Sequence, residues 1–519
     1  SSNDTTMVEH GNIVMPAKLG IGGLGAGVTF GSIPFALVLI GCIVRGWWLA
    51  AGIITLLGVA AAVVTVVTVK QGRNWYRRKA NRMAFRAAER RGDTLLVAGP
   101  AGRIPDGSFR LPGLLTASEL SEHKDSYGNP FGMIRLATAT TKHYTVVIEC
   151  FPDGDSLVDQ DRINRQVAHW GGWLAQLGVE DSIVGASVTI ESAPDSGLRL
   201  RRMVAENVSD HGSDFSTAVV GGLADTLSGG APQLSTRLAL TFNGTGLESK
   251  NSDRGVQEMA DEIGNRLPVL LASLGMTGAG TGAQACTAQD IVDFTRVAYD
   301  PTVSARVEQA RQEGGTGLTW SEAGPAFSEA KYDRYYHDRG VSKSWTMYEG
   351  PRSKFYATAL RRAFEPMKGV LRKRVTILYR PIPAGDAPDV IEAEINNAQF
   401  NSSTKQRATA RQKNRIRFAN KAAEEEAAGA GLIRFGMIIT TTCRTNDEFP
   451  RLEKVIPSLT NQARLKIREA LGNEDVAFLA GLPLGVVLPA HMTLPDQIRD
   501  WLLYTSPSPR DVEEPRMPS

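Results

Sequence analysis

The sequence predicts an α/β (α+β) fold with two duplicated lobes, each of element order ββαβααβα, that follow an N-terminal transmembrane helical hairpin. Three observations support this prediction. Two long uncharged stretches lie near the start of the chain, strand-like runs alternate with amphipathic helices after residue 92, and the same order returns in the second half. At 519 residues the chain exceeds what one hydrophobic core usually holds, so several domains are expected.

The hairpin is predicted for residues 19–69, after a tail at residues 1–18. No charged side chain occurs from Leu19 to Val44, and after Arg45 none occurs from Gly46 to Val69. Each stretch exceeds the roughly 20 residues that cross a bilayer as a helix. Basic residues crowd the end of the second stretch, which predicts a multi-pass protein of the plasma (inner) membrane with both termini in the cytoplasm.

Glycines at the start of this hairpin could instead indicate a dinucleotide-binding site. The string Gly20-x-Gly22-x-x-Gly25 has the spacing of a dinucleotide-binding turn, but neither a buried strand precedes it nor an ordinary helix follows it. We expect instead that Gly23, Gly27 and Gly31, four residues apart, form a small-residue ridge for helix packing.

A basic helix is predicted at residues 70–91, where nine Lys and Arg stand against one Glu. Its place beside the hairpin favours contact with anionic lipid. The predicted lipid-facing collar comprises Arg73, Arg77, Arg78, Lys79, Arg82 and Arg86. Aromatic residues alternate with these arginines, so a nucleic-acid patch is the alternative.

The first lobe is predicted at residues 92–275. Its strands are expected at 131–137, 143–150, 182–192 and 233–242, where β-branched and apolar residues gather. Apolar residues from Ile163 to Leu177 recur at steps of three and four, which predicts an amphipathic helix. A second helix is expected at 253–275, interrupted near Pro268. A Gly-rich linker at 276–325 follows.

The second lobe is predicted at residues 326–491, before a tail at 492–519. Strands are expected near 328–337, 342–349, 373–381 and 432–442, and helices at 353–364, 385–428 and 449–471. Two local echoes support a duplication: SVTIESAP is similar to RVTILYRP, and TRLALTF to IRFGMII.

Motifs of known chemistry are missing from the sequence. No phosphate-binding GxxxxGK[ST] loop occurs, and the four cysteines lie more than a hundred residues apart without zinc-site spacing. The strings Asp210 to Ser213 and His337-Asp338 suggest a triad fragment and a metal dyad, but no partner residues are marked. We therefore expect no catalytic residue, no metal and no cofactor, and predict that the chain is not an enzyme.

A further basic segment, Lys405 to Lys421, carries seven Lys and Arg and no acid. Arg407, Arg411 and Arg415 are four residues apart and form a candidate face for nucleic acid or a protein partner. A solvated helix face with ion pairs to the following glutamates is the alternative.

Several long strings carry a family resemblance: RLPGLLTASELSE, HYTVVIEC, AHWGGWLAQLG, TWSEAGP, RKRVTILYRP, AAEEEAAGAGLIRFG and FLAGLPLGVVLPAH. They resemble a family of actinobacterial integral-membrane proteins encoded with conjugation-type, type IV-like secretion ATPases. In layout the chain is similar to a two-helix inner-membrane component of the PrgI type, fused to a region similar to the amino-terminal part of the type IV secretion ATPase, with the motor domain absent.

This resemblance implies an inner-membrane scaffold of a conjugative or type IV-like secretion apparatus, which docks a separate ATPase on the cytoplasmic face. The expected partners are membrane lipid and that ATPase in trans, with a homo-oligomer and nucleic acid as further alternatives. A membrane-tethered enzyme and a membrane-anchored nucleic-acid-binding module are the rival functions. The residues after Leu502, YTSPSPRDVEEPRMPS, resemble a translated cloning or sequencing adapter, and SSNDTT before Met7 is similarly suspect. The positions of the true N- and C-termini therefore stay open, and so does the loss of a motor domain by truncation.

Overall fold

A computed structural model describes most of the chain. The described residues are 9–10, 26–67, 72–73, 75–102, 107–139, 141–152, 158–180, 182–194, 203–204, 206–207, 213–227, 232–246, 252–350, 355–356, 360–403, 410–427, 429, 431–461 and 463–491. The chain divides into two compact units, one of Ser1–Gly11, Asn81–Pro383 and Gly431–Ala490, the other of Asn12–Ala80, Ala384–Ala430 and His491–Ser519. The segments predicted as first lobe, linker and second lobe all contribute to the first unit.

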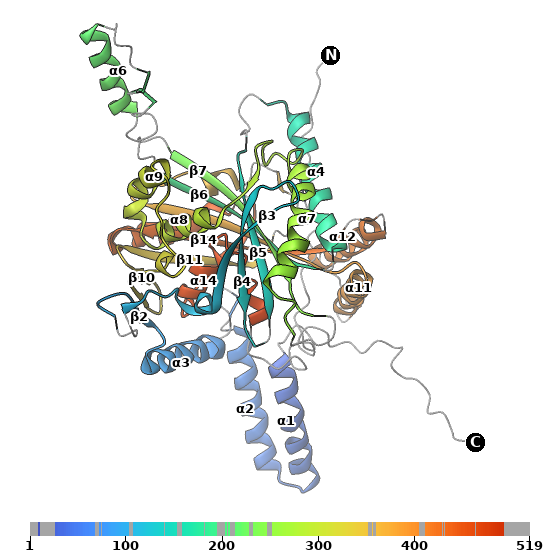
Figure 1. The fold of residues 1–519 in the computed structure, drawn as a ribbon. Coiled ribbons are helices and arrows are strands. Elements are labelled where there is room, and N and C mark those ends of the chain that lie inside the picture. Colours follow the sequence, from blue (N-terminus) through green and yellow to red (C-terminus); the bar gives the residue numbers. More distant parts are fainter. Residues whose placement is uncertain are drawn as a thin grey trace. The chain divides into compact units, whose positions relative to one another are not determined.

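A 13-stranded sheet forms the centre of the first unit (Figure 1). All of its strand pairs are antiparallel, and the predicted α+β class is confirmed in this form. In spatial order the strands are β2 (Leu95–Val97), β9 (Phe327–Ala330), β10 (Tyr335–His337), β11 (Gly340–Glu349), β14 (Ile433–Cys443), β13 (Arg372–Pro381), β6 (Ile183–Pro194), β7 (Pro232–Asn243), β5 (Lys142–Cys150), β4 (Pro130–Ala137) and β3 (Ser118–Lys124), with β15 (Lys466–Glu469) beside β11 and β8 (Gln284–Ala285) beside β5.

Helices cover both faces of this sheet. On one face lie α4 (Gln160–Val179), α7 (Val256–Leu274), α10 (Arg361–Phe364) and α13 (Phe449–Leu459), and on the other lie α8 (Ala288–Tyr299) and α14 (Glu474–Ala480). Successive strand residues serve opposite faces. Val146 of β5 therefore packs in the core with α4 and α7, whereas Val147 packs in the core with α8 and α14.

The strand order reads the same outward from the pair formed by β6 and β13. In one direction it runs β6-β7-β5-β4-β3, and in the other β13-β14-β11-β10-β9. The short added strands match as well. Strand β8 pairs with β5 and is followed by α8, and in the same way β15 pairs with β11 and is followed by α14. At the centre of the pair, Thr189 lies opposite Thr376, and their Oγ1 atoms are 3.0 Å apart.

Two predicted helices have different bounds in the structure. Helix α7 continues through Pro268 rather than breaking there. Proline cannot donate to the carbonyl four residues earlier, but the Ser126 N–H donates to this Gly264 carbonyl instead, at 3.1 Å. The helix predicted at 449–471 ends at Leu459, and β15 follows, because Leu465 and Ile467 alternate with exposed residues as in a strand.

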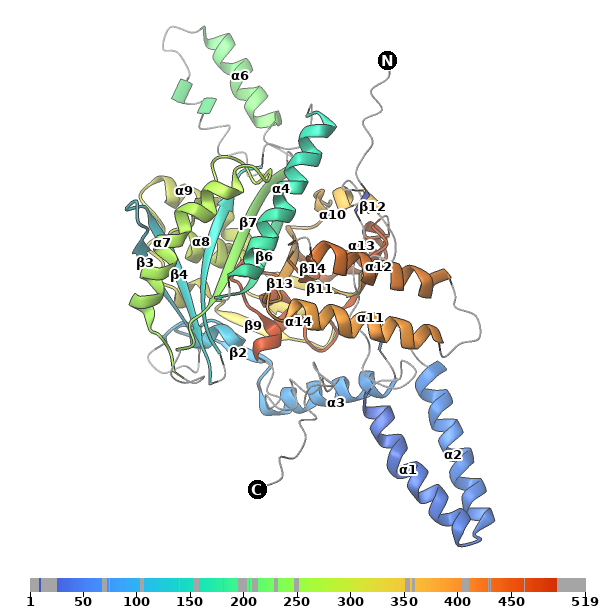
Figure 2. The same ribbon diagram turned by 90° about the vertical axis from the view of Figure 1, so that its right-hand side faces the viewer.

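The second unit contains helices. They are α1 (Ala26–Val44), α2 (Trp48–Val67), α11 (Ala387–Ser403) and α12 (Ala410–Ala427), and the last two run side by side (Figure 2). Gly46 adopts a φ of 72° in the turn between α1 and α2. The basic helix α3 (Trp75–Arg91) belongs to both units, and a short pair of β1 (Glu9–His10) with β12 (Phe355–Tyr356) completes the described strands.

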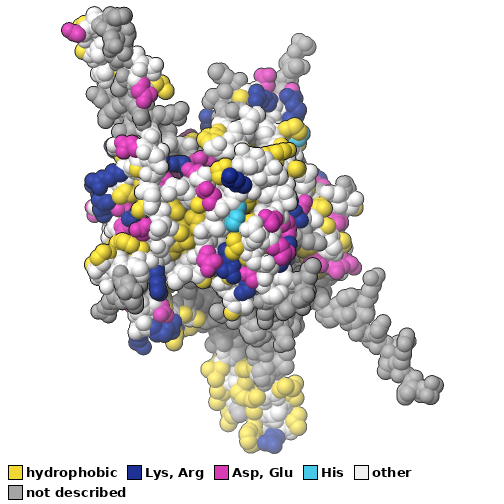
Figure 3. All heavy atoms as spheres, viewed as in Figure 1, with side chains coloured by type: hydrophobic (Ala, Val, Ile, Leu, Met, Phe, Trp, Pro, Cys, Tyr) yellow, Lys and Arg dark blue, Asp and Glu magenta, His cyan; other side chains and the backbone are white. Residues whose placement is uncertain are grey.

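The prediction of a membrane-spanning hairpin needs correction. Apolar side chains such as Leu49 and Leu56 are exposed on the described part of α1 and α2 (Figure 3). Nevertheless, none of the helices in the described residues has the length and apolar character that bilayer crossing requires. Within the uncharged stretches, the described helices span Ala26–Val44 and Trp48–Val67. The predicted multi-pass location in the plasma membrane, with both termini cytoplasmic, is therefore wrong.

Candidate functional site

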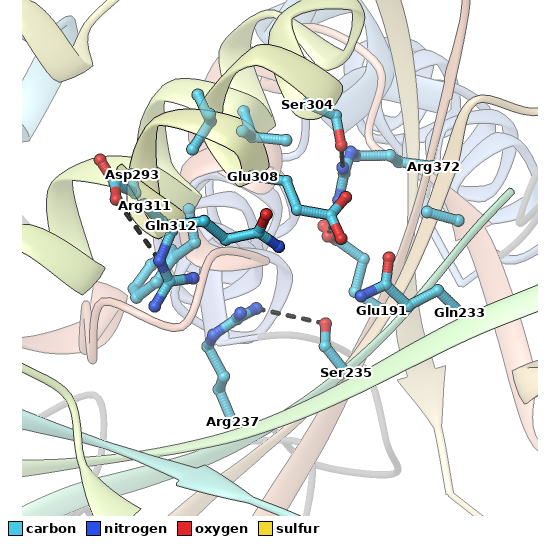
Figure 4. A pocket seen from close by; sticks show the side chains of 14 residues that line it. Glu191, Gln233, Ser235, Arg237, Asp293, Ser304, Glu308, Arg311, Gln312 and Arg372 are labelled. Atoms are coloured by element: carbon cyan, nitrogen blue, oxygen red, sulfur yellow. Dashed lines mark hydrogen bonds and ion pairs between the residues drawn. The ribbon is translucent and has the colours of Figure 1, made fainter. Parts of the chain in front are cut away.

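A polar cavity of about 340 Å³ lies between the sheet and the helices α8 and α9 (Ser304–Gln312) (Figure 4). Strands β6, β7 and β13 supply one side of it. Its lining residues are Glu191, Ala193, Gln233, Ser235, Arg237, Asp293, Phe294, Val297, Ser304, Val307, Glu308, Arg311, Gln312 and Arg372.

Three arginines surround one carboxylate on the sheet side. Arg372 forms an ion pair with Glu191, and the Arg374 Nε atom lies 3.8 Å from the other carboxylate oxygen of Glu191. Burial would raise the pKa of Glu191, but the guanidinium groups of Arg372, Arg374 and Arg237 outweigh burial and hold this pKa below its usual range. Glu191 is therefore ionised at neutral pH.

Arg374 is the most deeply buried of these arginines. Its side chain is 2% exposed, and its guanidinium stacks 4.5 Å above the Phe478 ring centroid. Its three guanidinium nitrogens donate no hydrogen bond to any residue in the described part of the chain. Burial lowers the pKa of Arg374 to about 10, still well above neutrality. A charged group without hydrogen-bond partners is rare in a protein interior and calls for an explanation.

Arg237 joins the cluster from the neighbouring strand β7. Its Nη2 atom donates to Glu149 at 3.1 Å, its Nη1 donates to Ser235 at 3.2 Å, and its guanidinium lies 4.7 Å from the Phe294 ring centroid. Figure 4 shows that its side chain extends along the floor of the cavity.

The helix side of the cavity carries acids and amides. Helix α8 begins with a capping box in which Thr287 and Asp290 bond each other's backbone N–H groups. One turn later, Asp293 is 1% exposed, accepts hydrogen bonds from Gln289 and Thr316, and lies 3.6 Å from Arg311 Nε. From α9, the side chains of Glu308 and Gln312 extend into the cavity (Figure 4).

This arrangement offers charged and polar groups that can bind a ligand. Guanidinium groups only donate hydrogen bonds, whereas carboxylates only accept them when ionised. The sheet side therefore offers the donors of Arg237 and Arg372 around Glu191, and the helix side offers the acceptors of Asp293 and Glu308 beside Arg311. Among the residues that the structure describes, no group of three or more His, Cys, Asp or Glu side chains could hold a metal ion.

The pair His337-Asp338 does not converge on one site. His337 is fully buried, its ring nitrogens bond the Tyr299 carbonyl at 2.5 Å and the Ser342 hydroxyl at 2.7 Å, and burial lowers its pKa to about 4. Asp338 instead pairs with Arg296 and accepts from the backbone of residues 326 and 327. The string Asp210 to Ser213 lies outside the described residues except for its last member.

The other predicted site residues are separate from this cavity. Gly23 and Arg407 lie outside the described residues. Gly27 and Gly31 belong to α1, and Arg411 and Arg415 to α12, where the surroundings of the side chains are not described.

The predicted basic collar belongs mainly to α3. Arg77, Arg78, Lys79, Arg82 and Arg86 are residues of this helix, and Arg73 precedes it. Arg82 stacks 5.5 Å from the Tyr332 ring centroid, and Phe85 contacts the same ring edge-on. These contacts hold this part of α3 against the sheet unit. The predicted role of the collar in binding lipid stays a prediction.

The arginine cluster itself was not predicted. Its signal in the sequence is small: Arg372 and Arg374 alternate within the apolar strand RKRVTILYRP, and Glu191 lies within SVTIESAP. Charged residues at alternate positions of a buried strand share one face. Nothing in the sequence indicated that these strands are neighbours.

Comparison of the sequence with models of protein families gave no match, and comparison with curated proteins gave none either.

Proposed function

We propose that this chain is a scaffold subunit of a conjugative or type IV-like secretion apparatus, and that it docks a separate ATPase. The family resemblance supports this proposal, and three of its strings lie in the core of the first unit. HYTVVIEC coincides with β5, RKRVTILYRP with β13, and FLAGLPLGVVLPAH with α14 and the segment after it.

We also infer that the sheet arose from two copies of one unit. The echo of SVTIESAP with RVTILYRP equates Thr189 with Thr376, and these two residues are cross-strand partners at the centre of the β6–β13 pair. This coincidence is what a two-fold axis through the pair requires. A duplicated sheet without a phosphate-binding loop favours a structural role over a motor.

The docking surface that we propose is α6 (Asp214–Leu227), in the connection from β6 to β7. Phe215, Val219 and Leu223 are 80%, 52% and 56% exposed. Their spacing of four residues puts them on one stripe of the helix. An exposed apolar stripe is typical of a surface that another protein covers, and this observation carries the proposal.

The experiment is a binding assay with a P-loop ATPase of a conjugative or type IV-like secretion apparatus. The full chain, which should not hydrolyse ATP itself, should retain the ATPase on a column. The triple variant Phe215→Ser, Val219→Ser, Leu223→Ser should lose it. Val269→Ser is the matched control, because Val269 is 71% exposed on α7. Equal retention by the triple variant, or no retention by the unaltered chain, would contradict the proposal.

A further inference from the structure

The charged cluster of the cavity occurs at only one end of the central β6–β13 pair. Thr189 corresponds to Thr376, so each residue of β6 corresponds to one that is 376 − 189 = 187 positions later in β13. Arg374 then corresponds to Ser187, Arg372 to Gly185, and Glu191 to Leu378.

The same correspondence extends to the next strand on each side. Arg237 pairs with Thr189, and Ile438 pairs with Thr376, so Arg237 corresponds to Ile438. One end of the central strands therefore carries three arginines and a glutamate, contributed by both halves, where the other end carries glycine, serine, isoleucine and leucine.

The corresponding positions at the other end of the same strands hold small or apolar side chains, so this backbone does not require charges there. Removing an ion from water costs several kcal/mol, which its partners offset only with good geometry. A cluster that is costly to bury and that the corresponding positions lack indicates a function of its own.

The two ends of the central strands are also covered differently. Over the end without charges, the chain after α14 lies on the sheet: the Thr241 hydroxyl donates to the Gly485 carbonyl at 2.7 Å, and a Cβ on Gly185 would lie 2.7 Å from Val487. Over the charged end, α9 leaves the cavity of about 340 Å³, which Glu191, Arg237 and Arg372 line. Arg374 is buried beside them against Phe478.

We propose that this cavity binds a small molecule with an oxyanion group, either carboxylate or phosphate, at the arginine side and hydroxyl groups at the side of α9. The guanidinium groups of Arg372 and Arg237 bind the oxyanion, and Arg374 adds positive charge behind Glu191. The planar guanidinium matches the two oxygens of a carboxylate or phosphate. Glu308 accepts hydrogen bonds from the hydroxyl groups, and Gln312 can both accept from them and donate to them.

The size of the cavity limits the ligand. Ligand cavities in proteins usually span about 300 to 1,000 Å³. A volume of about 340 Å³ fits a hydroxy acid or a sugar phosphate. It is too small for a nucleotide with its base, sugar and phosphates all enclosed. This proposal does not depend on the docking of an ATPase.

The test is isothermal titration of the purified full chain with glucose 6-phosphate, L-malate and glucose. We expect saturable binding of one molecule per chain for at least one of the two anions and none for glucose. Preference between the anions distinguishes phosphate from carboxylate. Failure of both anions to bind the folded chain, or equal binding of glucose, overturns the proposal.

Variants make the test specific to the cavity. Arg372→Gln and Arg237→Gln should each weaken binding about tenfold or more, because each removes a charge-assisted hydrogen bond. Arg374→Ser, which installs the residue of the corresponding position Ser187, should do the same. Arg266→Gln is the matched control, because Arg266 lies on α7 at the opposite face. Circular dichroism checks the fold of each variant, and binding that survives Arg372→Gln in a folded protein overturns the proposal.

Discussion

At the scale of single residues, polar groups in the core of the first unit are matched mainly by neighbours from distant parts of the chain. Along the sheet, Thr145 bonds Thr241, and Ser344 bonds Thr440. The Thr376 hydroxyl donates to the Gly481 carbonyl at 2.7 Å. Such pairs satisfy buried hydroxyls that would otherwise cost about 1 to 3 kcal/mol each. Arg374 contrasts with them, because its nitrogens have no such partner among the described residues.

His337 should make stability depend on pH. Burial lowers its pKa from 6.5 to about 4, so the unfolded chain binds a proton there from about pH 6.5 downward while the folded chain does not until about pH 4. Lowering the pH through this window therefore favours unfolding, by about 3 kcal/mol in total. Urea unfolding at pH 7 and pH 5 measures this loss.

The variant His337→Asn separates this effect from that of the carboxylates. It should be less stable than the unaltered protein at pH 7, because the Tyr299 and Ser342 bonds are disturbed, but it should lose less stability on going to pH 5. The same loss in both proteins would show that His337 is not the titrating group.

At the scale of elements, the segment after α14 depends on one glycine. Gly485 has a φ of +66°, and a Cβ there would meet the hydroxyls of Thr241 and Thr145. Gly485→Ala should lower the free energy of unfolding by about 2 kcal/mol or more, through backbone strain and this clash. Chemical unfolding measures the change.

Gly436 supplies the matched control for this substitution. It lies in β14 without a positive φ, and nothing stands within 4 Å of a Cβ built on it. Gly436→Ala should be neutral or slightly stabilising, because alanine restricts the unfolded chain. Two variants of equal stability would contradict the role assigned to the segment after α14.

Strands were predicted well where apolar, β-branched residues gather. The run 143–150 became Lys142–Cys150, and 233–242 became Pro232–Asn243. Register was not predictable in the same way. The sequence equated TRLALTF with IRFGMII, but the ladder equates it with residues 437–443, four positions later. Apolar strands resemble one another at several offsets, and only the partner strand selects one.

The candidate site was less accessible to sequence reasoning than the strands. Glu191 and Arg372 are far apart in the chain and meet only because β6 and β13 pair. The spatial order of the strands in the sheet follows from the packing of whole elements, not from the residues within one strand. The charged residues are visible in the sequence, but their proximity in the folded protein could not be predicted from it.

At the scale of the whole molecule, the two predicted lobes form one sheet. The β6–β13 pair joins them through a continuous ladder from Lys373 with Ser192 to Tyr379 with Ala186. We expect residues 92–275 and 326–491 to unfold together, because separation would expose two long strand edges.

Hydrogen exchange followed through a urea titration tests this expectation. Backbone amides of β5 and of β11 should lose protection at the same urea concentration. Earlier loss in one half, with the other still protected, would mean that the lobes are independent folding units. Amides of α7, on the outer face of the first half, provide the internal reference.

The position of β13 also has a consequence during synthesis. The 187 residues between Thr189 and Thr376 take roughly 10 to 40 s to translate at about 5 to 20 residues per second. During that interval the first half on the ribosome has β6 as an unprotected edge, which invites pairing with the same strand of a neighbouring nascent chain. A charge on such an edge discourages that pairing. We therefore expect Glu191, which has no Arg372 beside it until the second half emerges, to oppose such pairing in the nascent chain.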